Sequence, residues 1–172
     1  MTRDREKQGT TPSQTVGPFF HFALARDDGP GRLTGAAAGE RMKLRVRVED
    51  GDGQPVPDAL VEILHADSGF GRLPTGPDGT CVFDAIRPSP QPDGRSGWQA
   101  PHFNVCLFAR GLLHHLYTRI YLAGDPALAG DAILAAVPEN RRQTLLADRD
   151  ASGTWTFVIH LQGESETVFF DL

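Results

Sequence analysis

The chain has 172 residues, of which 40% are hydrophobic and 23% are charged, and its formal net charge is −5. This length and composition are typical of one globular domain with a sizeable core. We expect no nucleic-acid partner, because no long basic run is present, and no membrane association, because the apolar stretches are far shorter than the ~20 residues that span a bilayer. The N-terminus lacks the apolar core of a secretory signal, and both cysteines lie in apolar runs. We therefore expect a cytoplasmic protein with buried, reduced thiols.

The first part of the chain differs in character from the rest. Prolines and a glycine interrupt the aromatic cluster TPSQTVGPFFHF at 11–22, a pattern that indicates an extended arm rather than a helix. We expect residues 1–28 to form an N-terminal arm that packs on a partner subunit, and residues 29–172 to form a single domain. Aromatic residues near both ends of the chain favour a buried interface between subunits.

The next part of the chain has the pattern of β-strands. Residues 42–48 alternate between apolar and basic side chains, as in a strand with one buried face. Turns rich in Gly, Pro and Asp then separate four more expected strands, while residues 87–101 are predicted to be a loop. The four strands are expected at 59–66, 80–86, 102–109 and 112–122.

Helical signals follow these strands. Asp125 and Pro126 predict the start of a helix that continues to Val137, and Pro138 predicts the start of a second helix that reaches residue 148. Residues 154–162 alternate again, and residues 166–172 are expected to close the chain as a last strand. Seven or eight strands with one or two short helices indicate an all-β fold, a mixed or antiparallel β-sandwich.

Two levels of resemblance accompany this pattern. Residues 51–83 resemble the transthyretin-like sandwiches, many of which only bind or connect other molecules. Five further segments together resemble the alpha-type subunits of the intradiol ring-cleavage dioxygenases that act on 3,4-dihydroxybenzoate (protocatechuate), over roughly residues 10–172. The loop after Ala66 is shorter than that family's, and the loop around 29–40 differs from it. The five segments are TPSQTVGPFF, PHFNVCLFARG, HLYTRIYLAGDP, PENRRQTLLA and LQGESETVFFDL.

This resemblance implies a subunit of an oxidoreductase. In the family, both atoms of O₂ enter the substrate as its ring opens between the two hydroxyls, which gives 3-carboxy-cis,cis-muconate. The resemblance implies that this chain pairs with an iron-bearing beta subunit of the same fold, and that the alpha–beta pairs assemble further. The beta-type subunit holds Fe(III) with two tyrosines and two histidines, so the cofactor is expected in the partner.

This chain lacks most of those iron ligands at the matching positions. Gln91 stands at a tyrosine position and Asn104 at a histidine position, so that only His102 matches. The two tyrosines of the chain, Tyr117 and Tyr121, both follow His102, so the first tyrosine ligand is also missing. Because carboxamides are poor ligands for ferric iron, we expect vestigial positions, no metal and no catalytic residue in this chain. A lone imidazole of this kind is more often a satisfied core or interface histidine.

The remaining histidines do not rebuild a metal site. His114 and His115 are adjacent, so on a strand they point to opposite faces and cannot chelate together. His115 and Tyr117 share a face that continues through Arg119 and Tyr121, and this row is expected to be a solvated or interfacial stripe.

The resemblance assigns a substrate-binding role to four other residues. Arg110 matches an arginine that faces the substrate across the subunit boundary, and a guanidinium suits the carboxylate of the substrate. Thr15, Gly17 and Pro18 match the arm that lines the substrate pocket of the partner; Gly allows close approach of the backbone and Pro makes a rigid wall. The alternatives are that Arg110 caps a strand at the surface and that the arm only seals an interface.

Two other functions remain compatible with the sequence. One is a transthyretin-like binding module without catalysis, which has no reason to carry both the arm and the C-terminal segment of the family. The other is a self-sufficient intradiol enzyme with altered metal ligands.

Strand parity further predicts one shared face for five residues of the central segment: His102, Asn104, Cys106, Phe108 and Arg110.

Overall fold

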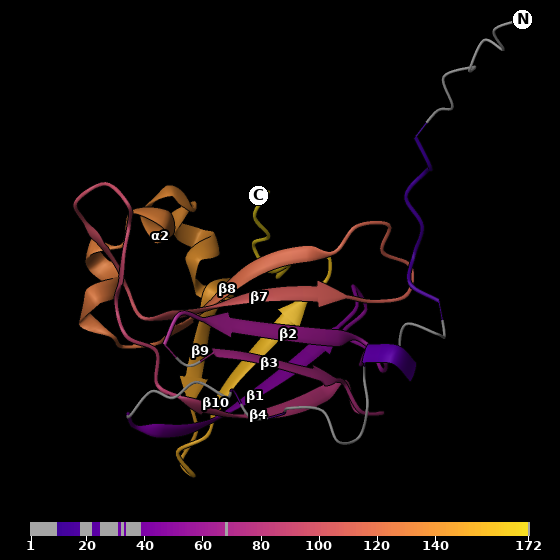
Figure 1. The fold of residues 1–172 in the computed structure, drawn as a ribbon, viewed down its shortest axis with the longest axis horizontal. Coiled ribbons are helices and arrows are strands. Elements are labelled where there is room, and N and C mark those ends of the chain that lie inside the picture. Colours follow the sequence, from indigo (N-terminus) through magenta and orange to yellow (C-terminus); the bar gives the residue numbers. More distant parts are fainter. Residues whose placement is uncertain are drawn as a thin grey trace, which may run out of the picture.

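The computed structural model describes residues 10–17, 22–24, 31, 33, 39–67 and 69–171. In this part of the chain two sheets enclose the main hydrophobic core, and short helices lie at one end of the sandwich (Figure 1). The predicted all-β sandwich is therefore confirmed. The first sheet consists of β4 (Thr80–Ile86), β1 (Arg41–Glu49), β10 (Trp155–His160) and β9 (Leu146–Arg149). The second consists of β3 (Gly69–Pro74), β2 (Leu60–His65), β7 (His102–Phe108) and β8 (Leu116–Leu122).

Strand β9 joins the two sheets. It pairs in parallel with β8, where Tyr121 lies opposite Leu146, and antiparallel with β10, where Trp155 lies opposite Arg149. The strand order is therefore continuous from β3 to β4 through β9. Strands β1 and β10 are also parallel, so the sandwich is mixed, and the two sets of strands cross at a large angle (Figure 1).

The alternation of β1 produces the core as predicted. Met42, Leu44, Val46 and Val48 are at most 7% exposed, whereas the basic residues between them face outward or lie at half-buried positions. The opposite wall of the core is formed by every second residue of β7, namely Phe103, Val105 and Leu107. A strand with one apolar and one polar face is stable only when its apolar face is covered, which is why two sheets form.

The helical region differs from the prediction. Asp125 caps as expected, since its side chain accepts the N–H of Ala127, but η1 (Pro126–Gly130) is a short 3₁₀ helix. The expected continuous helix to Val137 is wrong, because Asp131 is extended and starts a new helix, α2 (Ala132–Ala136). A third helix, η2 (Glu139–Leu145), follows Pro138 and ends where β9 begins.

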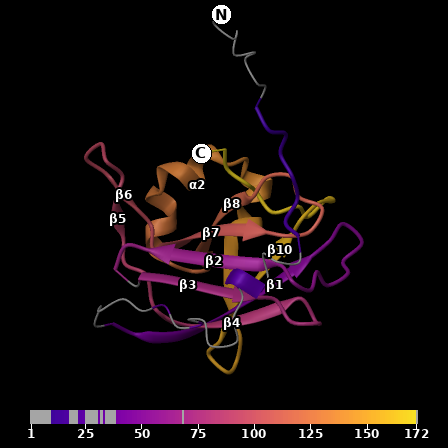
Figure 2. The ribbon, with the colours of Figure 1, turned by 45° about the vertical axis from the view of Figure 1, so that its right-hand side comes forward.

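Three further segments depart from the expectations. β3 was not expected, and β9 lies where a helix was predicted to continue. The C-terminal segment is not a strand but makes a single bridge between Phe170 and Tyr117, and Phe169 packs on the main core of this chain. The predicted loop at 87–101 contains a two-stranded hairpin, β5 (Gln91–Pro92) and β6 (Trp98–Gln99), which stands beside the helices (Figure 2).

Two further observations concern the cysteines and the helices. Cys81 is buried and Cys106 is half-buried, and neither forms a disulfide. None of the helices found in the described residues has the length and apolar character needed to cross a bilayer.

Two turn glycines test the fold. Gly79 has φ +74°, and a Cβ there would lie 2.7 Å from the carbonyl oxygen of Val48, whereas Gly53 has φ +71° and open space around it. Gly53→Ala should cost only the left-handed strain of about 1–2 kcal/mol. Gly79→Ala should cost a further ~1–3 kcal/mol, because backbone must move to relieve the overlap. The free energies of unfolding in urea check this; equal losses would contradict it.

Candidate functional site

The three vestigial ligand positions lie at one end of β7. Gln91 is on β5, and His102 and Asn104 are on β7, on the face opposite the core residue Phe103. The predicted parity is confirmed for residues 102–108 of β7, whereas Arg110 lies in the turn that follows this strand. The two β7 side chains nevertheless have different surroundings, because His102 is 3% exposed whereas Asn104 is exposed.

His102 is a buried histidine with a hydrogen bond at one ring nitrogen. Its Nδ1 lies 2.7 Å from the carbonyl oxygen of Ala100, and because a carbonyl only accepts, Nδ1 carries the proton. Its ring packs on that of Tyr121, with centroids 5.4 Å apart. Burial lowers the pKa of His102, the positive charge of Arg119 lowers it further, and the bond to Ala100 and the carboxylate of Asp131 act in the opposite direction. The imidazole is therefore held neutral.

A buried carboxylate organises the surroundings of His102. Asp131 is fully buried, and its Oδ2 accepts the N–H of Ala100 at 2.8 Å. Its Oδ1 accepts the N–H of Leu134 at 2.7 Å and the hydroxyl of Tyr121 at 3.2 Å. The carboxylate thus ties the segment before β7 to β8 and to the start of α2. Burial raises the pKa of Tyr121 to about 12.

Gln91 belongs to a second polar cluster. Its Nε2 donates to the hydroxyl of Ser89 at 3.1 Å and to Asp67 at 3.3 Å, and it lies 3.4 Å from Nε2 of His65. The hydrogen bond from Ser89 holds the pKa of Asp67 below its ordinary value. His65 is only 2% exposed, and its parity with the buried Ile63 could have indicated this from the sequence.

This donor set does not fit ferric iron. It offers one imidazole and two carboxamides, whereas Fe(III) favours anionic oxygen ligands. The nearby phenol of Tyr121 is a poor substitute, because its raised pKa disfavours the phenolate. Among the described residues, no group of three or more His, Cys, Asp or Glu side chains could hold a metal ion.

Two of the four expected substrate-binding residues, Thr15 and Arg110, lie beyond the other end of β7. The N–H of Gly111 donates to the hydroxyl of Thr15 at 2.8 Å, which fastens the arm beside Arg110. The side chain of Arg110 is 67% exposed and pairs with Asp58 at 3.3 Å. Gly17 is exposed, with no atom within 4 Å of an added Cβ, and Pro18 lies outside the described residues. Residues 10–17 of the arm run away from the sandwich (Figure 1).

Comparison with known proteins gives this geometry a context. No protein-family model matches the chain. It is 36% identical to the protocatechuate 3,4-dioxygenase alpha chain of Burkholderia cepacia and 35% identical to that of Pseudomonas putida, over 94% of this chain in both cases and 97% and 96% of the relatives. The chain belongs to the intradiol ring-cleavage dioxygenases, among their protocatechuate 3,4-dioxygenase alpha chains. The family expected from the sequence is confirmed.

Two further comparisons concern the partner and the fold. The beta chain of the Burkholderia cepacia enzyme is 31% identical over 66% of this chain and 57% of its own length. The dioxygenase domain of a dioxygenase carbohydrate-binding protein fusion from Streptomyces sp. SirexAA-E superimposes with a TM-score of 0.62 at 24% identity, covering 90% of this chain and 99% of that domain. The sandwich is therefore that of the intradiol dioxygenases.

The row expected to be a solvated stripe contains two separate hydrogen-bonded pairs, His115 with Tyr117 and Arg119 with Tyr121. Nε2 of His115 lies 2.8 Å from the hydroxyl of Tyr117, and both residues remain accessible. The other end of the row differs, because Tyr121 is fully buried and Arg119 donates to its hydroxyl at 3.3 Å. The stripe interpretation is thus wrong at Tyr121. Arg119 was predicted only as part of this row and not as a site residue.

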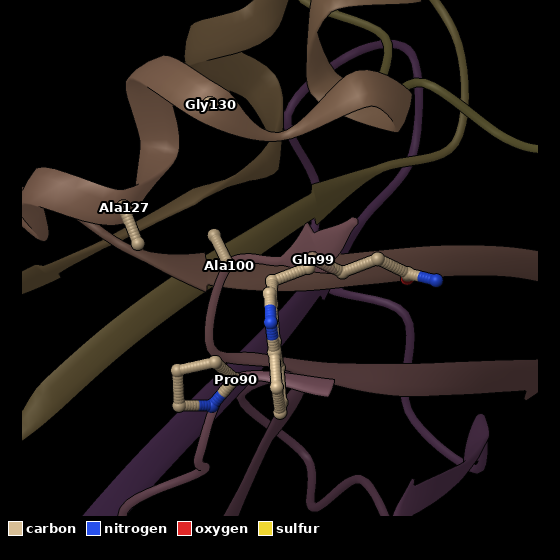
Figure 3. Close-up of a pocket in the computed structure, with 6 residues that line it drawn as sticks. Pro90, Gln99, Ala100, Ala127 and Gly130 are labelled. Atoms are coloured by element: carbon tan, nitrogen blue, oxygen red, sulfur yellow. The ribbon is translucent and has the colours of Figure 1, made fainter. Parts of the chain in front are cut away.

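A crevice beside the hairpin carries no evident chemistry. It has a volume of about 590 Å³, and its walls come from β6 and η1. Figure 3 shows the side chain of Gln99 extending away from Pro90 and Ala127. That side chain accepts a hydrogen bond from Nη1 of Arg119 at 2.7 Å instead. The lining residues are Pro90, Trp98, Gln99, Ala100, Ala127 and Gly130, none of which is an acid or a base.

The lowered pKa of His102 predicts a pH dependence of stability. As the pH falls below about 6.5, the unfolded chain binds a proton at this position before the folded chain does. The free energy of unfolding should therefore decrease in this range, and His102→Gln should flatten the decrease. Urea unfolding between about pH 8 and pH 5.5 measures it. His114→Gln, at an exposed histidine, is the control and should keep the slope of the unaltered chain. Equal slopes for both variants would contradict the prediction.

Proposed function

We propose that this chain completes the substrate pocket of an iron-bearing beta subunit and holds no iron itself. The complex would cleave 3,4-dihydroxybenzoate with O₂ between its hydroxyls, so that both oxygen atoms enter 3-carboxy-cis,cis-muconate. The observation that carries this proposal is the hydrogen bond between Thr15 and Gly111, which brings the arm and Arg110 together. These are the groups that the family resemblance assigns to the pocket of the partner.

The exposure of Arg110 supports this role. Its ion pair with Asp58 is open to water on both sides, with side-chain exposures of 67% and 52%. Such pairs contribute little to stability, so the guanidinium can exchange this partner for a substrate carboxylate at small cost. Asp58 has a φ of 64°, so the side chain that holds Arg110 belongs to a tightly turned segment.

The separation along β7 supports two different environments. Positions 102 and 110 are eight residues apart, about 26 Å in a fully extended strand. One aromatic substrate does not span that distance, so Arg110 would serve the pocket of the partner while His102 marks the vestigial position of this chain. We further propose that residues 1–28 form the arm that packs on the beta subunit, while residues 29–172 form a single domain.

The remaining parts of the proposal concern assembly and location. We place the alpha–beta pairs in a larger assembly, in the cytoplasm. The thiols of Cys81 and Cys106 are free, and burial raises their pKa values to about 12 and about 11, which suits unreactive thiols in a reducing compartment. A binding module without catalysis is disfavoured, because the chain belongs throughout its length to a family of ring-cleavage enzymes.

The metal assignment can be tested directly. Expressed alone, the chain should contain no stoichiometric iron and should not cleave 3,4-dihydroxybenzoate, because one imidazole and two amides cannot replace phenolates. Co-expression with an iron-bearing beta chain should give an active complex. Iron analysis and an oxygen-uptake assay of both preparations measure this. A single chain with stoichiometric Fe(III) and a phenolate charge-transfer band would overturn it.

The role of Arg110 has its own test in the assembled enzyme. Arg110→Ala should remove a charge-assisted hydrogen bond worth ~1.5–3 kcal/mol, and should lower kcat/KM for 3,4-dihydroxybenzoate ~10–150-fold. Catechol, which lacks the carboxylate, should lose far less. Asp58→Asn is the matched control, because it breaks the ion pair and leaves the arginine in place; it should retain activity. Equal losses for both substrates would make Arg110 structural.

A further inference from the structure

A cavity lies over the outer face of the second sheet. Its volume is about 640 Å³, within the range of sites for small molecules. It is bounded by strands β2, β3, β7 and β8, by Ile133 of α2 and by the C-terminal segment. Its lining includes four aromatic side chains from different parts of the chain, namely Phe70, Phe108, Tyr117 and Phe170.

The register of the strands arranges one line of side chains across this cavity. Leu64 pairs with Phe70 on one side and with Asn104 on the other, and Asn104 pairs with Arg119. Directly paired residues on one face lie about 5 Å apart at Cβ. The line therefore changes from apolar to polar to cationic over two strand spacings, from Leu64 to Arg119.

A second line runs beside the first. Glu62 pairs with Cys106, Cys106 pairs with Tyr117, and Tyr117 forms a bridge with Phe170. The N–H of Phe170 donates to the carbonyl of Tyr117 at 2.8 Å, which fixes the C-terminal segment as a wall of the cavity. The carboxylate of Glu62 is already neutralised by Arg72, whose Nε donates to it at 2.7 Å.

Arg119 is the free cation of this cavity within the described chain. Both of its side-chain hydrogen bonds use Nη1, to Gln99 and to Tyr121, and among the described residues no carboxylate lies within 4.0 Å of its guanidinium. Nε and Nη2 therefore remain for a ligand. The side chain of Asn104 makes no hydrogen bond within the described residues either. Apart from Glu62, the only carboxylate among the described residues of the lining is that of the exposed Asp171.

Exposed apolar surface lies beside this cation. Leu64 is 51% exposed and Phe70 is 37% exposed, although both belong to regular strands. Such apolar surface inside a concave site gains free energy when a flat apolar group covers it. The site thus offers an apolar floor, aromatic walls and, about 10 Å from Leu64, a guanidinium with free donors.

We propose that this cavity is a second ligand site, carried by the alpha chain itself, for a small planar aromatic carboxylate. The aromatic ring covers Leu64 beside Phe70 and Tyr117. The carboxylate accepts hydrogen bonds from Arg119 and from the amide of Asn104. The site is separate from the one that Arg110 serves, and it requires no metal, so it does not depend on the proposed function.

Binding of 4-fluorobenzoate tests the proposal, because this probe has the carboxylate and the ring but no hydroxyls with which to chelate iron. Calorimetric titration and ¹⁹F NMR of the full chain, alone and in complex with its beta chain, should show one probe bound per alpha chain. Arg119→Gln should weaken this binding about 10–150-fold. Cys106→Phe, which fills the cavity without touching the arginine, should abolish it. Lys43→Gln removes a cation from the other sheet and should change nothing.

The outcomes separate this site from the pocket of the partner. Binding that survives Arg110→Ala but is lost with Arg119→Gln supports the proposal, as does weaker binding of cyclohexanecarboxylate. Binding that follows Arg110 alone overturns it. Binding to the free chain that disappears in the complex also overturns it, because a partner segment then occupies the cavity. If Arg119→Gln does not fold, Cys106→Phe is the deciding variant. An unchanged affinity of that variant for 4-fluorobenzoate overturns the proposed site. If the complex binds the probe as expected but does not cleave 3,4-dihydroxybenzoate, the proposed function is contradicted and this second site is not.

Discussion

The buried carboxylate of Asp131 is the constraint on which this end of the molecule depends. A carboxylate without solvent is stable only when hydrogen bonds replace its water, and Asp131 accepts three, from Ala100, Leu134 and Tyr121. These three donors belong to elements that are far apart in the sequence. The carboxylate therefore brings the start of β7, the end of β8 and the start of α2 to one point.

The positions of the polar groups around Asp131 follow from this arrangement. The carbonyl of Ala100 accepts a hydrogen bond from Nδ1 of His102. The imidazole is therefore oriented by the same peptide segment that Asp131 holds. Tyr121 accepts from Arg119, so the guanidinium is placed by a phenol that Asp131 orients. Since burial keeps His102 neutral, Arg119 supplies the positive charge in this region. In an iron site the positive charge belongs to the metal ion. In this chain it belongs to the guanidinium of Arg119, which is held beside a cavity.

The two ends of β7 therefore have different chemistry. One end carries amides and a buried imidazole, close to the cavity that contains Asn104 and Arg119. The other end leads to Arg110, which is exposed and paired with the exposed Asp58, next to the hydrogen-bonded arm. In the proposed function, in which this subunit holds no iron, the first end would serve its own ligand and the second end would serve its partner. The proposed division of labour rests on this separation.

Local pattern was sufficient for the strands whose alternation is strong. The β1 strand was predictable because basic residues alternate with Met42, Leu44, Val46 and Val48, and the caps at Asp125 and Pro126 follow from side-chain chemistry close in sequence. The β3 strand was not predictable, because its two glycines and a proline are typical of turns. Pairing with β2 makes it a strand, and an added Cβ at Gly71 would lie 3.2 Å from the side chain of Phe83, so that one of the two would have to shift. Likewise, β9 became a strand only by pairing with β8 and β10.

The sequence by itself determined which side chains stand at the positions where the family resemblance implies iron ligands. Gln91 and Asn104 are amides in any fold, and no tertiary arrangement converts a carboxamide into a phenolate or an imidazole. The tertiary structure alone decided that Leu64, Asn104 and Arg119 lie in one line across a cavity. That line depends on the register between strands that are distant in the sequence. Register is set by hydrogen bonds and packing between whole strands, and a shift of one residue would turn these side chains to the opposite face of the sheet.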